Sequence, residues 1–431
     1  MNPAANESTA GSTDASTAES ATGSTTNATS GRTNAPASHD VVIAGGGLAG
    51  ASLAVGLARQ GFDVAVIEAV DREADHQPSY DDRTLVINRA SLNILGALGV
   101  IDDDLRRCPI RTIEITRAGG FGRVRLEAER HGVDRFGDVV VARELGNRLL
   151  AALKDGARIT EYCPERLETF VADDDGVDVR LASGTRLRGR LLVAADGTRS
   201  SIRQAAGMAS DLHDYRQSAM IFNVRPQPAA GATAHERFTP AGPLAFLPQP
   251  EGRLGVVWID ASDAIDEAMD WSDDELIARL SARAGADFQG FEQPGKRARY
   301  PLTLLRTPTP IGARTVAIGN AANTVHPVSA QGFNLGLRDV AGLLDALADA
   351  RDPGAPAWLA RYVKLRADDQ AETVRYTDTL ARTFTNPTLP FRLGAGLGLA
   401  AHAVLPGLQR RLVRAAMGFR EPVPTLARER T

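Results

Sequence analysis

Three glycines and one acidic residue near the start of the chain have the spacing of a dinucleotide-binding turn. The glycines are Gly45, Gly47 and Gly50, and Glu68 follows eighteen residues after the last of them. In such a turn the first glycine makes a tight bend, the second lets a pyrophosphate approach the backbone, and the third lets the helix pack closely on the strand. The phosphates would bind at the helix N-terminus. An acid at the position of Glu68 binds ribose hydroxyls, which favours FAD or NAD over NADP.

A second stretch that could carry chemistry runs from residue 319 to residue 336. Its glycine, proline and polar residues include Gly319, Asn320, His326, Pro327, Gln331, Gly332 and Asn334. The glycines and Pro327 shape a backbone that can approach a flat ring. The helix that starts at Gln331 and Gly332 offers free N–H groups and a positive dipole end, which stabilises negative charge on a reduced isoalloxazine ring. The alternative is a Pro/Gly loop that only caps a helix.

The sequence has no residue set that would perform difficult chemistry without a cofactor. The seven histidines never come two within four residues, and the cysteines, Cys108 and Cys163, stand 55 positions apart. We therefore predict no metal site and expect the chemistry to come from a bound cofactor. His326 is a candidate general base, although backbone geometry dominates the stretch around it.

A parallel sheet is needed to position these residues. Residues 40–44 and 62–67 form two buried strands around a helix, which is a βαβ nucleotide-binding unit. Two further strands, 191–195 and 315–318, lead into unusual turns. Between them, residues 211–301 lack a comparable strand followed by a turn and a helix, and we expect an inserted, mainly antiparallel sheet there.

Composition narrows the partners and the location of the protein. The chain has 49 Lys and Arg against 53 Asp and Glu, a net charge of −4, which disfavours binding to nucleic acid. The first 38 residues lack the basic and apolar regions of a secretory signal. The longest uncharged apolar stretch, 393–409, is short for a membrane span. We expect a cytoplasmic protein without a transmembrane helix.

The two motifs, together with a third, resemble those of a known enzyme family. The stretches GGGLAG with Glu68, AADGTRSSIR and AIGNAANTVHPVSAQGFNLGLRDV resemble FAD-dependent aromatic hydroxylases of the para-hydroxybenzoate hydroxylase type. Within that type, ERFTPAGPLAFLP and GKRARYPL are similar to the ubiquinone-biosynthesis hydroxylases, and to their methoxyphenol hydroxylase group in particular. The resemblance runs from about residue 40 to about residue 385.

The resemblance implies an α/β fold with a Rossmann-like FAD-binding domain, an inserted substrate domain of mainly antiparallel β structure and a helical C-terminus. The first 38 residues, of which 31 are Ser, Thr, Ala, Asn or Gly, would be a disordered tail because they cannot bury enough apolar surface. The expected boundaries are 1–38 for the tail, 39–109, 142–210 and 302–385 for the FAD-binding domain, 110–141 and 211–301 for the substrate domain, and 386–431 for C-terminal helices.

The resemblance also implies roles for individual residues. Asp196 and Gly197 would lie at the FAD pyrophosphate and the approach of NAD(P)H, and Gly319 with Asn320 at the ribityl chain and pyrophosphate. The wider family usually has Asp where this chain has Asn320, but an amide can still donate to phosphate and accept from a hydroxyl.

Two arginines complete the expected contacts. Arg83 would approach the flavin, and Arg143 matches loosely a position of polar FAD contact. Arg83 could instead form a surface ion pair, and Asp196 could be only a turn former. Trp258 and Phe246 could line an apolar substrate pocket or simply pack in the core.

The activity that the resemblance implies is hydroxylation of a polyprenylated phenol, 2-polyprenyl-6-methoxyphenol, in ubiquinone biosynthesis. FAD would be reduced by NAD(P)H and take up O2, and a flavin C4a-hydroperoxide would transfer an oxygen atom to the ring. Expected partners are the prenylated phenol, other ubiquinone-biosynthesis enzymes, further copies of the chain, and the inner membrane through peripheral contact of residues 391–419. The alternatives are hydroxylation of a soluble or secondary-metabolite aromatic, and a non-catalytic flavin-binding scaffold.

Overall fold

Five parallel strands form the centre of the first sheet in the computed structural model of the chain. The structure describes residues 36–72, 83–119, 123–285, 287–385, 396, 398–402 and 404–429. In spatial order the parallel strands are β8 (Ile159–Tyr162), β2 (Val64–Ile67), β1 (Ala37–Ala44), β11 (Arg186–Ala194) and β19 (Thr315–Ala317). A short strand, β18 (Ile311–Gly312), adds to the edge, and the antiparallel hairpin of β9 (Leu167–Ala172) and β10 (Val177–Leu181) pairs with β11.

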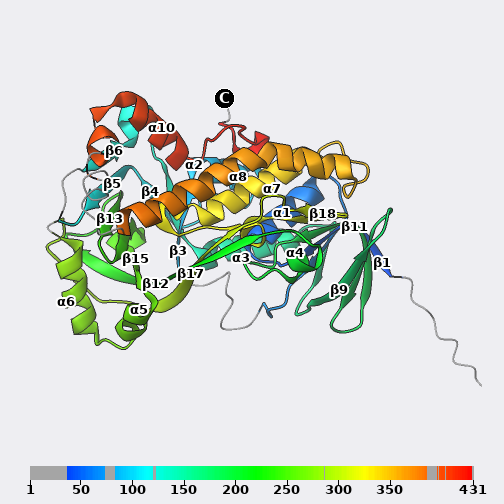
Figure 1. Cartoon of the computed structure of the whole chain (residues 1–431), viewed down its shortest axis with the longest axis horizontal. Helices are drawn as coiled ribbons and strands as arrows, with labels where there is room; N and C mark the ends of the chain where they lie inside the picture. The colour runs from blue at the N-terminus through cyan, green and yellow to red at the C-terminus, as the bar shows by residue number, and fades with distance from the viewer. Residues whose placement is uncertain are drawn as a thin grey trace, which may run out of the picture. The chain divides into compact units, whose positions relative to one another are not determined.

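The central strands are apolar on both faces because both faces are covered. Val41 and Ile43 of β1 pack in one cluster with three helices, whereas Val42 and Ala44 pack with the β9–β10 hairpin and α4 (Ser201–Ala205). The three helices are α1 (Leu48–Arg59), α3 (Ala142–Lys154) and α7 (Gly332–Leu347). A long helix, α8 (Pro356–Thr385), lies along α7 (Figure 1).

The second sheet is mainly antiparallel, as expected for residues 211–301. Its order is β20 (Asn323–Thr324), β17 (Ala298–Arg306), β12 (Asp211–Gln227), β15 (Leu254–Ala261), β14 (Gly242–Pro248), β13 (Thr233–Thr239), β5 (Thr112–Arg117) and β6 (Val124–Glu127). A short strand, β16 (Gly290–Glu292), pairs with β12. Two helices, α5 (Ser262–Met269) and α6 (Asp273–Ala284), cover one face. The pairing of β5 with β13 is parallel.

One strand of the segment 110–141 belongs to a different sheet from the one that we expected. β7 (Gly137–Val141) pairs with β3 (Thr84–Asn88) and β4 (Arg107–Ile110) in a separate three-stranded sheet. The alternation of apolar residues predicts a strand but says nothing about its partner. The next helix after β3 is α2 (Arg89–Ala97).

The two ends of the folded part also differ from the expected boundaries. β1 begins at Ala37, which pairs with Leu187, so the last residues of the expected tail join the sheet through backbone hydrogen bonds that need no apolar side chain. The other tail residues, 1–35, lie outside the described part, as do 386–395. Residues 36–431 form one unit by their contacts, so the domain boundaries within it stay predictions.

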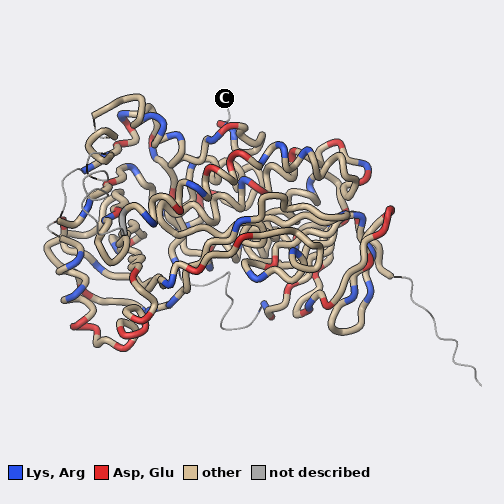
Figure 2. The backbone as a smooth tube through the Cα atoms, in the orientation of Figure 1, with Lys and Arg blue, Asp and Glu red and all other residues tan. Residues whose placement is uncertain are grey.

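The last described helix is α10 (Pro406–Ala416), beside which β6 lies (Figure 1). Short 3-10 turns are η1 (Ala128–His131), η2 (Pro250–Gly252), η3 (Gly319–Ala321), η4 (Val328–Ala330) and η5 (Thr425–Ala427). Positive and negative residues are scattered along the backbone trace, with uncharged residues between them (Figure 2). Of the helices that the structure describes, none combines the length and the hydropathy that crossing a membrane requires.

Candidate functional site

Both large sheets contribute residues to the wall of one cavity of about 1250 Å³. The residues predicted from the sequence that lie in its wall are Gly45, Gly47, Glu68, Arg83, Asp196, Gly197, Asn320, Pro327, Gln331 and Gly332. Five other predicted residues are not among the described lining residues: Gly50, Arg143, Gly319, His326 and Asn334. The structure therefore gathers three motifs from distant parts of the chain around one space.

The cavity has two contrasting walls. The turn wall consists of the residues at the carboxyl ends of the parallel strands, Gly45, Gly47, Glu68, Asp196 and Asn320. The sheet wall consists of the side chains of the second sheet that line the cavity; they are mainly apolar and include Ile113, Ile115, Val124, Leu126, Leu247 and Val257. Ligands of open α/β sheets bind outside the carboxyl ends of the strands, so the turn wall has the position of a nucleotide site.

The glycine turn cannot accommodate side chains at two of its positions. Gly45 has a φ of +106°, and a Cβ added there would lie 2.3 Å from the carbonyl oxygen of Ala195. A Cβ on Gly50 would lie 1.9 Å from the carbonyl oxygen of Gly45. Gly47 precedes α1 as its N-cap residue. Gly50 is thus required for the packing of the turn and not for direct contact with the cavity, which matches the packing role of the third glycine.

Glu68 follows β2 and is 9% exposed. Its Oε2 accepts a hydrogen bond of 2.8 Å from the Gly46 N–H, and its Oε1 accepts one of 2.8 Å from the Val70 N–H. Each carboxylate oxygen keeps a second lone pair. Glu68 can therefore hold the glycine turn in place and still accept a hydroxyl from a bound ribose. Arg72 strengthens the same corner by donating to the Gly46 carbonyl and by pairing with Glu161.

The strand β11 brings Asp196 and Gly197 to the turn wall. Asp196 accepts a hydrogen bond of 3.1 Å from the Ser201 N–H at the start of α4, and Gly197 has a φ of +86°. Asp196 is thus a turn former, as its alternative interpretation proposed. It also lines the cavity and is exposed, so the same carboxylate remains accessible to a ligand.

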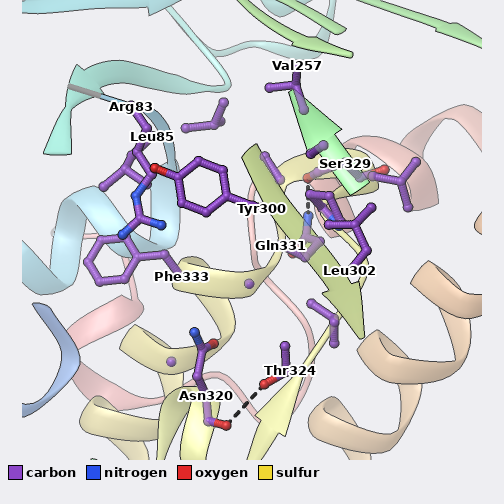
Figure 3. A pocket seen from close by; sticks show the side chains of 18 of the residues that line it. Arg83, Leu85, Val257, Tyr300, Leu302, Asn320, Thr324, Ser329, Gln331 and Phe333 are labelled. Carbon is purple, nitrogen blue, oxygen red and sulfur yellow. Dashed lines mark hydrogen bonds between the residues drawn. The ribbon is translucent and has the colours of Figure 1, made fainter. Parts of the chain in front are cut away.

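Gly319 packs against the buried part of the fold, whereas Asn320 lines the cavity. Gly319 has a φ of +56° and donates its N–H to the buried Asp339 carboxylate at 3.2 Å. Asn320 accepts a hydrogen bond of 3.1 Å from the Thr324 hydroxyl at its backbone carbonyl, which leaves the amide side chain at the cavity (Figure 3). The departure from Asp to Asn320 therefore still provides both a donor and an acceptor.

Below these turns, α7 and α8 share a buried ionic network. Arg366 pairs with Asp339 at 3.1 Å and with Asp369 at 2.7 Å, and Arg338 pairs with Asp369 at 2.7 Å. All four side chains are almost completely buried. The network holds Asp339, and through it the amide of Gly319, in a defined position.

The loop that precedes α7 carries backbone strain and an unsatisfied polar atom. Ser329 and Ala330 are consecutive residues with φ values of +64° and +49°, a region that L-residues rarely adopt and that is strained. Gln331 is 3% exposed and donates from Nε2 to the Ser329 carbonyl at 3.3 Å. Its Oε1 is buried without a hydrogen-bond partner among the described residues. A buried acceptor in a cavity wall fits a ligand that donates a hydrogen bond there.

Arg83 is a cavity residue. Its guanidinium lies 5.5 Å from the centre of the Tyr300 ring (Figure 3), and Phe333 lines the same cavity. The acidic neighbours Asp81 and Asp82, which its alternative interpretation invoked, lie outside the described residues. The cation beside the Tyr300 ring places a positive charge at the wall of the cavity.

Two more of the predicted residues, Asn334 and Arg143, are not among the described residues that line the cavity. Asn334 is 1% exposed; its Nδ2 donates to the carbonyls of Val86 and Ala330, and its Oδ1 accepts from the Asn88 N–H. It therefore connects β3 to the start of α7. Arg143 is exposed on α3 and is not among the described lining residues.

His326 supports the loop instead of facing the cavity. It is 1% exposed, and its Nδ1 accepts a hydrogen bond of 3.2 Å from the Val328 N–H. The ring packs edge-on against Tyr215 at 5.1 Å. Burial lowers the pKa of His326 to about 4. His326 is therefore buried, is not among the described lining residues, and supports the backbone of the loop through its Nδ1.

The sequence interpretation missed several residues of the sheet wall. Trp258 and Phe246 pack in the core beside α5 and α6, while their neighbours Val257 and Ala245 line the cavity. The same rule applies to β13, where Glu236 lies in the wall between Ala234 and Phe238. The period of two along a strand could have found it, as an acid between two apolar residues on one face.

Comparisons with known proteins agree with this geometry. The model of a family described as FAD binding domain matches residues 38–377. Ubiquinone hydroxylase UbiL of Rhodospirillum rubrum is 36% identical over 388 residues, which cover 88% of this chain and 89% of the relative. The 3-demethoxyubiquinol 3-hydroxylase of Escherichia coli is 33% identical over 400 residues, with 90% and 100% covered.

Solved structures show the same fold. The p-nitrophenol 4-monooxygenase PnpA from Pseudomonas putida has a TM-score of 0.70 at 18% identity, with 89% of this chain and 100% of that chain covered. A variant of HpxO from Klebsiella pneumoniae, complexed with FAD, has a TM-score of 0.70 at 17% identity, with 89% and 99% covered. The expected fold of the para-hydroxybenzoate hydroxylase type is confirmed.

Proposed function

We infer the substrate from the family, because this chain has an FAD-binding domain, belongs to the ubiquinone-biosynthesis hydroxylases and is an FAD-dependent monooxygenase. We propose that it hydroxylates a polyprenylated phenol, 2-polyprenyl-6-methoxyphenol. The names of the relatives support a substrate on the route to ubiquinone. NAD(P)H is the proposed electron donor and O2 the proposed cosubstrate.

The residues of the turn wall fit FAD. The glycine turn leaves backbone space for a pyrophosphate, and Glu68 can accept from ribose hydroxyls. The unsatisfied Oε1 of Gln331 and the start of α7 suit the polar edge of an isoalloxazine ring. When bound, FAD supplies the transfer of electrons and oxygen that no side chain of the described cavity wall can perform. The chain itself binds and orients the reactants and excludes water.

The observation that carries the substrate class is the apolar character of the sheet wall. The six apolar side chains from Ile113 to Val257 that were named for this wall come from four strands, β5, β6, β14 and β15, and all line the cavity. A surface of this kind desolvates an isoprenoid chain and an aromatic ring, with about 0.8 kcal/mol gained per buried methylene. It provides little for a small charged aromatic.

Product analysis tests the proposal. Purified protein with FAD, NADH or NADPH and a prenylated 2-methoxyphenol should form a product heavier by one oxygen atom, and cells lacking the gene should accumulate the methoxyphenol precursor. Turnover of a soluble aromatic in its place would support the alternative substrate class. A protein that binds FAD but oxidises no phenol would be a flavin-binding scaffold.

We also propose peripheral membrane contact near α10, because a long isoprenoid substrate is held in a bilayer. Val404 is 76% exposed and Leu405 50% exposed at the start of this helix. Arg410, Arg411 and Arg414 follow on α10, where Figure 2 shows a group of basic residues. Apolar residues beside basic ones favour an anionic bilayer surface.

A double variant tests this contact. Val404→Asp with Leu405→Asp should reduce sedimentation with anionic liposomes, while FAD content stays unchanged. Equal sedimentation of the variant and the unmodified protein would rule out this surface. The exposed Val171→Asp, on the β9 strand, is the matched control.

A further inference from the structure

One carboxylate stands within the otherwise apolar part of the cavity. Glu236 lies on β13 between Ala234 and Phe238, whose side chains are buried on the same face. Its cross-strand neighbours are Ala245 on β14 and Ile115 on β5. All five residues line the cavity. An acid in such surroundings is costly unless it has a function, because burial disfavours its charged form.

The groups that face Glu236 come from two other elements. From the loop before α7, the Ser329 N–H donates a hydrogen bond to the carboxylate. From α8, Tyr376 hydrogen-bonds with Ser329 and has the Arg420 guanidinium 5.4 Å from its ring centre, and the charge of Glu236 contributes to the raised pKa of Tyr376. No ion pair joins Glu236 to a described Lys, Arg or His side chain. Burial raises the pKa of Glu236 to about 7, and the hydrogen bond from Ser329 opposes this only in part.

Other titratable residues line the cavity at different places: Arg83, Glu165, Arg166 and Arg199 belong to the first part of the fold, Tyr300 to β17, and His402 precedes α10. Glu68 and Asp196 accept backbone N–H groups at the turn wall. His235 lies 3.3 Å from the Glu114 carboxylate, and burial lowers its pKa. Burial raises the pKa of Tyr376, so its hydroxyl stays protonated and can only donate to an anion. Among the described lining residues that come from the second sheet, Glu236 is the carboxylate that an apolar phenol would meet.

We propose that Glu236 is the catalytic base that accepts the proton of the phenol hydroxyl of the substrate. This inference rests on the proposed function. The O–H bond of the phenol breaks, its electron pair stays on the phenol oxygen, and the proton forms the O–H bond of the Glu236 carboxyl group. The developing phenolate enriches the ring carbons in electrons. The Ser329 N–H holds the carboxylate at the sheet wall, and Tyr376 contacts Ser329 from α8.

The pH profile of turnover gives the first test. In the unmodified enzyme kcat/KM should rise with pH through about 7, because the base must be ionised. In Glu236→Gln, whose side chain has nearly the same shape, kcat/KM at pH 7 should be about 100-fold lower than in the unmodified enzyme. The rise of kcat/KM with pH through about 7 should be absent from this variant. Above pH ~10 the phenol ionises without help, so the deficit should shrink to less than about tenfold. Glu236→Asp should keep the limb at reduced kcat.

Binding to the oxidised FAD enzyme gives a second readout that needs no turnover. The probe is 2-methoxy-6-prenylphenol, followed by the change in flavin absorbance. Its affinity should increase about tenfold as pH rises from 6 to 8, because the carboxylate accepts the hydroxyl proton in a hydrogen bond. The methyl ether of the probe, and Glu236→Gln with either ligand, should show no such increase. The exposed Glu292→Gln on β16 is the matched control and should behave as the unmodified protein.

The outcomes separate this inference from the proposed function. If the enzyme hydroxylates the probe and Glu236→Gln keeps the same pH limb and the same binding profile, Glu236 is not the base. If the unmodified FAD protein neither binds nor oxidises the phenol, the proposed function itself fails, and the role of Glu236 fails with it. FAD content and the melting temperature of each variant establish that it is folded.

Discussion

The turn wall and the sheet wall of the cavity solve different binding problems with different parts of the chain. The turn wall presents mainly backbone, from Gly45 and Gly47 to the start of α7, and its side chains are used to hold that backbone. The sheet wall presents side chains, with Glu236 as the carboxylate among apolar neighbours. A cofactor with invariant phosphates suits a rigid backbone cradle, whereas a substrate is selected by the shape and polarity of side chains.

The comparison predicts which substitutions disturb the protein globally and which affect substrate alone. The turn wall is supported by a buried ionic network and by close glycine contacts. Substitutions there should therefore lower the free energy of unfolding and weaken the binding of FAD. The sheet wall is one face of a mainly antiparallel sheet. Substitutions there should therefore change the binding and turnover of the substrate. Each prediction below tests one side of this contrast.

Arg366→Met should have the largest effect on stability. It leaves the buried carboxylates of Asp339 and Asp369 without their shared cation, which costs about 3–5 kcal/mol. Urea unfolding should show this loss, and FAD should dissociate more readily because Asp339 holds the Gly319 amide. The control is Arg361→Met, an exposed arginine on the same helix, with a cost below about 1 kcal/mol. Equal losses would show that the network does not support the turn wall.

Ala245→Trp should close the sheet wall without disturbing the cofactor. Ala245 lies beside both Glu236 and Val257 in the register of the sheet. A tryptophan there occupies the space of the substrate, and kcat/KM should fall about 100-fold, equivalent to about 3 kcal/mol. The flavin content of the purified protein should stay unchanged, as should both properties in the exposed turn variant Ala241→Trp. Loss of flavin would break the contrast between the walls.

His326 should make the loop between the walls sensitive to acid. Because its folded-state pKa of about 4 lies below the ordinary histidine value of 6.5, the unfolded chain binds more protons at acidic pH. The contribution to stability is complete above pH ~6.5 and is lost as the pH falls toward 4, by about 2 kcal/mol between pH 7 and pH 5. Unfolding of His326→Asn, which keeps an acceptor for the Val328 N–H, should lack this part of the pH dependence.

Gln331→Leu should have the smallest effect and a distinctive one. It removes the buried oxygen that has no partner among the described residues, so the FAD-free protein should change in stability by less than about 1 kcal/mol. The dissociation constant of FAD should rise about tenfold, which isothermal titration can measure. Gln204→Leu, an exposed change on α4, should alter neither quantity. Unchanged FAD affinity would mean that Gln331 faces no donor of the cofactor.

How much of the site could be predicted follows from the range of the interactions. The glycine turn could be identified because Gly45, Gly50 and Glu68 act within one βαβ unit, where spacing along the chain equals spacing in space. Asn334 was recognised as important, but its partner Val86 stands 248 positions away. No local pattern shows that its amide connects two elements instead of contacting a ligand.

The sheet wall was less accessible to sequence reasoning. The strands around Phe246 and Trp258 could be recognised, but a large aromatic residue marks a buried face and not the face of a cavity. Helices α5 and α6 cover that face, which leaves Ala245, Val257 and Glu236 on the other. The pairing of β7 with β3 was equally hidden, because apolar alternation is the same for any partner strand.

The sequence by itself determined the nucleotide-binding turns, the first βαβ unit, the presence of an inserted sheet and the resemblance to a hydroxylase family. These features depend on glycine conformations, strand and helix periodicity and motifs whose residues are neighbours along the chain. Only the tertiary structure decided which residues reach the cavity: it turned His326 and Asn334 into supports and brought Glu236 opposite Ser329 and Tyr376. The reason is physical, since burial, desolvation and hydrogen-bond partners are set by elements that meet only when the chain folds.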